Sequence, residues 1–194
     1  KAEACGTWVI VDESFLDFRE DCEEYTVRHL VKSYPHLFVV QSMTKFFALP
    51  GLRLGFGVAG AELCRRLEEG KDVWNVNFLA QAAGIAALSD TEYQEAARSF
   101  IRTEKKFLAS ELAKLPGVEV FAPSVNFIFF RLRQGKDFLR RLLAALRERG
   151  ILLRDCSNYA GLDGAYLRTA VRSREENERL LEEMQALWKE MDAV

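Results

Sequence analysis

Residues 41–57 read Gln41-Ser42-Met43-Thr44-Lys45-Phe46-Phe47-Ala48-Leu49-Pro50-Gly51-Leu52-Arg53-Leu54-Gly55-Phe56-Gly57. The stretch places Lys45 just after a short apolar run, flanks it with Ser42 and Thr44, and puts Arg53 in a glycine-bounded turn. Hydroxyl groups and a guanidinium are donors that hold a phosphate dianion. A lysine amine beside them can form an imine with an aldehyde whose phosphate they anchor. The stretch therefore predicts a site for pyridoxal phosphate, with Lys45 as the catalytic residue and Ser42, Thr44 and Arg53 as phosphate ligands.

A carboxylate at the end of an earlier apolar run is the next candidate. Residues 7–11 are β-rich and lead directly into Asp12, the pattern of a buried strand whose C-terminal end meets a site. A carboxylate beside the ring nitrogen of pyridoxal phosphate favours the protonated ring that draws electrons from the substrate. The alternative for Asp12 is an ordinary cap of a turn at the end of a strand.

The pattern along the chain predicts two regions. In the first, strands over residues 7–11, 37–41 and 52–59, with a helix over 24–33, indicate an α/β fold whose parallel or mixed sheet binds ligand at the strand ends. A long helix, opened by a capping box of Thr91 and Gln94, runs to about residue 115. The second region is expected to be a small α+β domain. Its predicted strands and helices are strands 118–121, 126–132, 151–154 and 166–171, and helices 136–149 (closed by Gly150) and 174–191. We place the two domains at residues 1–105 and 106–194.

The lysine segment also resembles a known family. Its pattern S-x-T-K-x-x-A-L-P-G-L-R-L-G is similar to that of fold-type I pyridoxal-phosphate enzymes of the class I and II aminotransferase family, in the branch of histidinol-phosphate aminotransferases and threonine-phosphate decarboxylases. Residues 12–18 resemble the D-E-x-[YF]-x-x-F segment of the family, which implies that Asp12 lies under the ring nitrogen. The resemblance covers only the second half of such an enzyme. It implies the C-terminal part of a large domain followed by the small domain, in a protein that is a homodimer when complete. A cytoplasmic location is expected by default, because the first residues show no charged-then-apolar signal pattern.

Phe15 departs from the pattern of many aminotransferases in this group, which have a tyrosine at that place. The resemblance implies that Phe15 lies at the cofactor, where a tyrosine hydroxyl would donate to the ring oxygen. Phenylalanine has no such donor, so the oxygen should hold its proton to higher pH. The alternative is that Phe15 is simply part of the core.

Two arginines of the second region are candidate substrate ligands. Arg154 and Arg168 fall on successive predicted strands, and two guanidinium groups can bind two anions, a carboxylate and a phosphate. Their segments resemble the substrate-binding pair of the family, in which the second arginine takes the α-carboxylate and the first assists with the distal phosphate. The alternative for both is a surface salt bridge.

The resemblance implies an enzyme acting on a phosphorylated amino acid or amine. The favoured activity is decarboxylation of L-threonine O-3-phosphate to (R)-1-amino-2-propanol phosphate, in cobalamin biosynthesis. The first alternative is a histidinol-phosphate aminotransferase or a related class I or II aminotransferase. The second is a non-catalytic piece that lacks the N-terminal half and is inactive by itself.

Composition excludes several other functions. The net charge is −2, and no basic stripe with interleaved aromatic residues points to nucleic acid. The four cysteines form no C-x-x-C motif and have no histidine at metal-ligand spacing, so neither a metal site nor a disulfide framework is expected. No apolar run approaches the roughly 18 residues of a membrane span.

Overall fold

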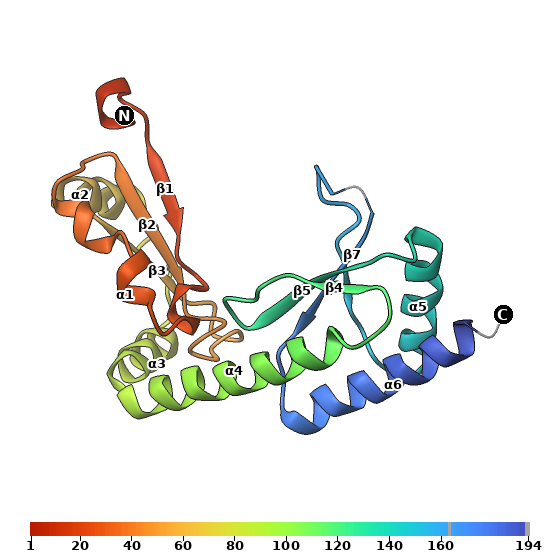
Figure 1. The fold of residues 1–194 in the computed structure, drawn as a ribbon. Coiled ribbons are helices and arrows are strands. Elements are labelled where there is room, and N and C mark those ends of the chain that lie inside the picture. The colour runs from red at the N-terminus through yellow and green to blue at the C-terminus, as the bar shows by residue number, and fades with distance from the viewer. Residues whose placement is uncertain (163, 193–194) are drawn as a thin grey trace. The chain divides into compact units, whose positions relative to one another are not determined.

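The computed structural model describes residues 1–162 and 164–192 (Figure 1). The chain forms two compact units, residues 1–98 and residues 99–194. The division falls inside helix α4 (Thr91–Leu112), which also contains the junction predicted between residues 105 and 106. As a domain boundary, that junction stays a prediction.

A three-stranded mixed sheet forms the centre of the first unit. Its strands, in spatial order, are β1 (Val9–Asp12), β2 (Leu37–Ser42) and β3 (Gly55–Ala59). β1 runs parallel to β2, with Asp12 opposite Val40, and β3 runs antiparallel to β2, with Gly55 opposite Ser42. The C-terminal ends of β1 and β2 and the N-terminal end of β3 therefore lie at one edge of the sheet. The predicted α/β class with a parallel or mixed sheet is confirmed.

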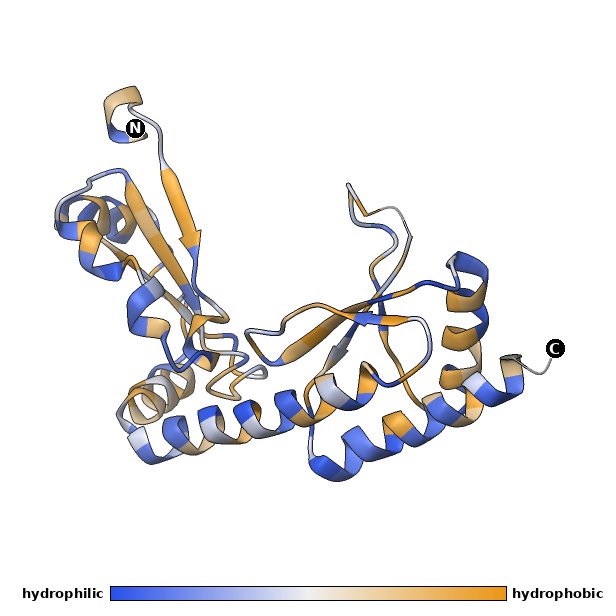
Figure 2. Ribbon diagram, viewed as in Figure 1, coloured by the Kyte–Doolittle hydropathy of each residue, from blue (hydrophilic) through white to orange (hydrophobic). Residues whose placement is uncertain are grey.

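Side-chain alternation along β2 builds the core of this sheet. Leu37 and Val39 are 7% and 0% exposed and pack with Val31, while the neighbouring residues Phe38 and Val40 are half-buried. This is the period of two that a strand imposes. Figure 2 shows the hydrophobic residues concentrated on β1 and β2. Burying each such aliphatic side chain stabilises the fold by about 1.5–3 kcal/mol.

The connection from β1 to β2 differs from the helix predicted over residues 24–33. Besides the 3-10 turn η1 (Glu3–Cys5) near the N-terminus, the short elements here are η2 (Leu16–Phe18), α1 (Cys22–Tyr25) and η3 (Arg28–Lys32). Thr26 is extended (φ −64°, ψ 138°), and the backbone N–H of Val27 donates to the Glu13 carboxylate at 2.8 Å. Because the ψ of Thr26 lies far from the helical value, the helix ends at Tyr25 and one continuous helix over residues 24–33 cannot form.

Three helices follow β3, namely α2 (Ala61–Gly70), α3 (Phe78–Ser89) and α4. The capping box predicted from Thr91 and Gln94 is wrong. Asp90 is the residue that caps α4, because its Oδ1 accepts the backbone N–H of Tyr93 at 2.9 Å. The Gln94 amide turns back and donates to two carbonyls at the end of α3. A strong cap one residue earlier places Thr91 inside the helix.

The second unit is a four-stranded antiparallel sheet with helices. Its elements are β4 (Val118–Val120), β5 (Phe127–Leu132), α5 (Lys136–Glu148), β6 (Arg154–Asp155), β7 (Ala165–Ala170) and α6 (Arg174–Asp192), with strand order β4-β5-β7-β6. Burial alternates along β5 and β7, so one face is fully buried, with Phe130 and Leu167 both 0% exposed. Trp188 of α6 is 3% exposed, meets the ring of Phe138 edge-on, and donates its indole N–H to the carbonyl of Pro116 at 2.9 Å.

The strand predicted over residues 151–154 is shorter and begins only at Arg154. Gly150 has a left-handed φ of 75°, and the N–H of Ile151 bonds back to the carbonyl of Leu146 at 2.8 Å. Together with the bond from Gly150 to Arg147, this is a Schellman motif that confirms Gly150 as the residue after the helix. The N–H of Ile151 is thus used by the helix end and is not free for a sheet.

Candidate active site

The turn that carries Lys45 is held by buried neighbours. Met43, Phe46 and Phe47 are 1%, 1% and 6% exposed, and the Tyr93 hydroxyl donates to the carbonyl of Phe46 at 2.9 Å. Ala48 has a left-handed φ of 53°, a conformation that costs an L-residue roughly 1–2 kcal/mol. The packing therefore fixes a backbone that the local sequence would not adopt alone.

Helix α3 approaches this turn closely through Gly84. A Cβ at Gly84 would lie 2.5 Å from Leu54 Cδ2 and 3.5 Å from Met43 Sδ. Only glycine fits against Leu54 without displacing it. Gly84 therefore lets α3 pack closely against Met43 and Leu54, which lie on either side of Lys45 in the sequence.

The hydroxyl groups and the amine predicted to act together do lie together. Lys45 Nζ donates to Thr44 Oγ1 at 3.0 Å, and Thr44 Oγ1 lies 2.8 Å from Ser42 Oγ. Lys45 Nζ is also 6.0 Å from the centre of the Phe15 ring. The structure thus gathers Ser42, Thr44, Lys45 and Phe15 at the edge where β1 and β2 end. Their roles toward a cofactor stay predictions.

Arg53 lies at the same edge, immediately before β3. It has a left-handed φ of 57°, and its side chain donates to the carbonyl of Pro50 at 3.0 Å. This turn residue is the reason that the strand predicted from residue 52 begins only at Gly55. The guanidinium is exposed, and we keep it as a predicted phosphate ligand.

Asp12 ends β1 with an exposed carboxylate. Ser14 donates two hydrogen bonds to this carboxylate, one from its side chain and one from its backbone N–H at 2.8 Å. The side-chain bond is the larger of the two causes that hold the pKa of Asp12 below its usual range. The group is therefore ionised at neutral pH. A fixed negative charge at this place fits the protonated nitrogen of a pyridine ring.

Arg154 and Arg168 lie directly opposite each other on β6 and β7. Arg168 is half-buried with its guanidinium 4.8 Å from the centre of the Phe127 ring, and Arg154 lies 5.7 Å from that of Tyr159. Within residues 1–162 and 164–192, neither forms an ion pair with a carboxylate. Two opposed cations without such partners can accept two anionic groups. Their role as substrate ligands stays a prediction.

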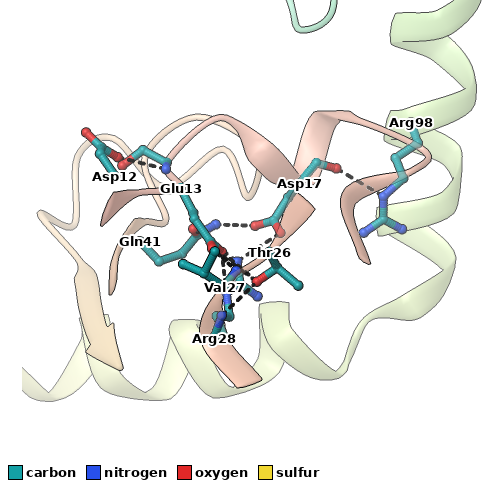
Figure 3. Close-up of polar contacts among 9 residues, drawn as sticks. Asp12, Glu13, Asp17, Thr26, Val27, Arg28, Gln41 and Arg98 are labelled. Atoms are coloured by element: carbon teal, nitrogen blue, oxygen red, sulfur yellow. Dashed lines mark hydrogen bonds and ion pairs between the residues drawn. The ribbon is translucent and has the colours of Figure 1, made fainter. Parts of the chain in front are cut away.

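A buried polar network behind Asp12 was not predicted (Figure 3). It joins Glu13, Asp17, Arg28 and Gln41, and the two carboxylates and the amide are 3%, 9% and 3% exposed. Alternation at the end of β1 could have placed Glu13 on the face opposite Asp12. No spacing reveals Arg28 and Gln41 as partners, because they reach the network from η3 and β2.

The residues at this edge fit pyridoxal phosphate. Two hydroxyls and Arg53 are donors of the kind that hold its phosphate, Asp12 supplies the charge for its ring nitrogen, and Lys45 supplies the amine. Among the described residues, no group of three or more His, Cys, Asp or Glu side chains gathers as a metal site. In that same part of the chain, no helix is both long and apolar enough to cross a membrane.

Fold and site together define an enzyme class, the pyridoxal-phosphate enzymes of fold-type I. The chain belongs to the class I and II aminotransferase family, whose family model matches residues 1–184. Members of this family that resemble the chain are decarboxylases and aminotransferases that use pyridoxal phosphate.

Three known proteins show the similarity in detail. The chain is 38% identical over 98% of its length to a provisionally named threonine-phosphate decarboxylase of Caldanaerobacter subterraneus. It is 39% identical over 89% of its length to the threonine-phosphate decarboxylase of Salmonella typhimurium. The crystal structure of the histidinol-phosphate aminotransferase from Clostridium acetobutylicum matches 97% of the chain at 32% identity with a TM-score of 0.89, and 56% of that protein is covered. The chain spans about half the length of the two decarboxylases, 51% and 46%.

Proposed function

We propose that the complete protein containing this chain decarboxylates L-threonine O-3-phosphate to (R)-1-amino-2-propanol phosphate, in cobalamin biosynthesis. The observation that carries the proposal is the opposed pair Arg154 and Arg168, which suits a substrate with one carboxylate and one phosphate. Sequence identity to the curated threonine-phosphate decarboxylases, 38% and 39%, exceeds the 33% and 34% found for two histidinol-phosphate aminotransferases, which supports this reaction over amino transfer.

Each candidate residue has a role in this proposal. When bound, pyridoxal phosphate would accept the electrons left at the substrate α-carbon as carbon dioxide departs. Lys45 would deliver the proton to that carbon, Asp12 would keep the ring nitrogen protonated, and Phe15 would pack beside Lys45 without offering a hydroxyl. Ser42, Thr44 and Arg53 would hold the cofactor phosphate.

Arg168 would decide which bond breaks. The bond that breaks is the one held perpendicular to the cofactor ring, so an anchor on the α-carboxylate favours loss of carbon dioxide over loss of the α-proton. Arg154, opposite it, would hold the distal phosphate and fix the rotation of the substrate.

Two alternatives remain from the sequence. The TM-score of 0.89 to a histidinol-phosphate aminotransferase favours amino transfer as the second candidate, in which the same lysine moves the α-proton. The third is that the isolated chain is a non-catalytic piece.

The test uses the complete protein with its cofactor and no keto-acid acceptor. We expect carbon dioxide from L-threonine O-3-phosphate, and a loss of roughly 10- to 150-fold in kcat/KM for Arg168→Ala, the range of a lost hydrogen bond to a charged group. Arg172→Ala is the matched control, because Arg172 pairs with Glu176 on the surface, and it should change little. Amino transfer between glutamate and histidinol phosphate, without carbon dioxide release, would assign the protein to the aminotransferases.

We also propose that the complete protein is a cytoplasmic homodimer. The outer side chains of the segment around α3 are apolar and strongly exposed, with Trp74 at 88%, Phe78 at 79% and Ile85 at 70%, and such a surface is typical of an interface. All four cysteines are unpaired, which supports a reducing compartment. Light scattering on the complete protein tests the dimer, and a monomer at micromolar concentration would contradict it.

A further inference from the structure

The segment from Asp12 to Phe18 has two sides with opposite surroundings. Asp12 is exposed at the edge of the sheet, while Glu13, the next residue, is 3% exposed and points to the other side. Figure 3 shows Asp12 pointing away from the cluster around Glu13. One side of this segment can therefore meet a ligand while the other is fixed in the protein.

Glu13 anchors the start of the segment. Its carboxylate accepts the Thr26 hydroxyl at 2.9 Å and the Val27 N–H at 2.8 Å, and it pairs with Arg28 Nε at 2.8 Å. Two hydrogen-bond donors from the residues before η3 and the charged group of Arg28 thus converge on one buried carboxylate next to Asp12.

Asp17 anchors the other end of the segment. Its carboxylate accepts a hydrogen bond from the Gln41 amide and pairs with Arg28 Nη2 at 3.4 Å. Its backbone carbonyl accepts Arg98 Nε at 3.0 Å. These contacts tie η2 to β2 and to α4, so the segment is braced on both sides of Phe15.

Burying these charged groups lowers the stability of the folded state. Two buried carboxylates share Arg28, and burial is the main cause that raises the pKa of Asp17 above its usual range. Apolar residues of similar size often replace buried ion pairs without loss of stability. A segment that needed only to pack would not require these charges, whereas one that must hold a fixed geometry can use the directional hydrogen bonds they make.

We propose that Glu13 and Asp17 are positioning residues, which fix residues 12–18 so that Asp12 and Phe15 meet the cofactor ring in one geometry. The inference rests on the proposed pyridoxal-phosphate site and adds to it the residues that act through Asp12.

The test is a double-mutant cycle on cofactor affinity, measured by absorbance titration of the complete, cofactor-free protein with pyridoxal phosphate. Asp12→Asn should weaken binding about tenfold or more, the scale of a charge-assisted hydrogen bond. Glu13→Gln and Asp17→Asn should each weaken it several-fold in the Asp12 protein and less than about twofold when residue 12 is Asn, because residues that act through one another are not additive. Asp21→Asn, which alters a partly buried pair with Arg19 just beyond the segment, is the matched control and should leave affinity unchanged.

Hydrogen exchange of the cofactor-free variants supplies a second measurement that also shows whether they fold. The amides of residues 12–18 should exchange faster in Glu13→Gln and Asp17→Asn, while those of β2 stay protected. Equal losses of affinity in both residue-12 backgrounds, or unchanged exchange over 12–18, would overturn the positioning role and leave the proposed function intact. No effect of Asp12→Asn itself would remove the cofactor assignment of Asp12, and the positioning inference with it.

Discussion

Each of the two units has a buried cluster in which acidic side chains pair with a single arginine. The two clusters differ in how many carboxylates share that arginine. In the second unit Glu104, 6% exposed, accepts Arg174 Nε at 3.1 Å and Nη2 at 3.0 Å, and the Asn177 amide at 3.1 Å. Hydrogen bonds from Arg174 are the main cause that lowers the pKa of this carboxyl. In the first unit Arg28 serves both Glu13 and Asp17, and burial raises the pKa of Asp17.

Because of this difference, the cluster of the second unit stabilises the folded state, whereas that of the first unit destabilises it. The charge of Glu104 is matched by one cation and one amide, so it favours the folded state. The charge of Asp17 is only partly matched, so its ionised form opposes folding. Proteins retain such unfavourable groups mainly where function needs them, and Asp17 stands in the segment that carries Asp12.

The largest effect should come from removing Arg28. Arg28→Met leaves two buried carboxylates without their shared cation and should lower the free energy of unfolding by about 3–5 kcal/mol, as breaking a buried pair does. Urea unfolding followed by circular dichroism measures it. Arg65→Met, which removes an exposed helical pair with Glu62, should change the free energy of unfolding very little. A similar small loss for Arg28→Met would show that the first cluster is not a buried charge site.

Removing Arg174 should cost less. Arg174→Met strands one carboxylate instead of two, and Asn177 still donates to Glu104, so we expect a smaller loss of unfolding free energy than for Arg28→Met. The same unfolding experiment gives the comparison. If this loss equals or exceeds that of Arg28→Met, the contrast between the clusters is wrong.

Neutralising one acid in each cluster should change the free energy of unfolding in opposite directions. Glu104→Gln should destabilise by about 1–2 kcal/mol at neutral pH, because it removes a charge-assisted pair. Asp17→Asn should lie within about 1 kcal/mol of the parent, on the stabilising side, because it removes a poorly compensated buried charge. A clear loss for Asp17→Asn would mean that its contacts outweigh its burial.

The smallest effects should appear in the pH dependence of the melting temperature. The pKa of Glu104 is lowered, so its stabilisation is present above the ordinary value of 4.5 and is lost as the pH falls below it. The pKa of Asp17 is raised, so its contribution is present below 3.8 and is lost as the pH rises through the raised value. Glu104→Gln should therefore flatten the acid side of the profile, and Asp17→Asn should flatten the region above pH 3.8. Parallel profiles for both variants would contradict the opposite directions.

The sequence predicts those parts of the site that depend on residues close together in the chain. Lys45, Thr44 and Ser42 follow one strand and Asp12 ends another, and parallel pairing of the two strands brings them to one edge. The buried network escapes prediction, because Arg28 meets Glu13 and Gln41 meets Asp17 only after three elements have packed. The helix expected over residues 24–33 is interrupted at Thr26, whose backbone is extended and whose hydroxyl donates to the buried Glu13.

The burial of Trp188 gives the chain an internal spectroscopic label. Trp8 and Trp74, both in the first unit, are 49% and 88% exposed, whereas Trp188 in the second is 3% exposed and donates its indole N–H to a carbonyl. Fluorescence from the first two should be red-shifted and readily quenched by acrylamide, and that from Trp188 should be blue-shifted and resistant. Emission wavelength alone can therefore tell which unit loses its structure first, without any added dye.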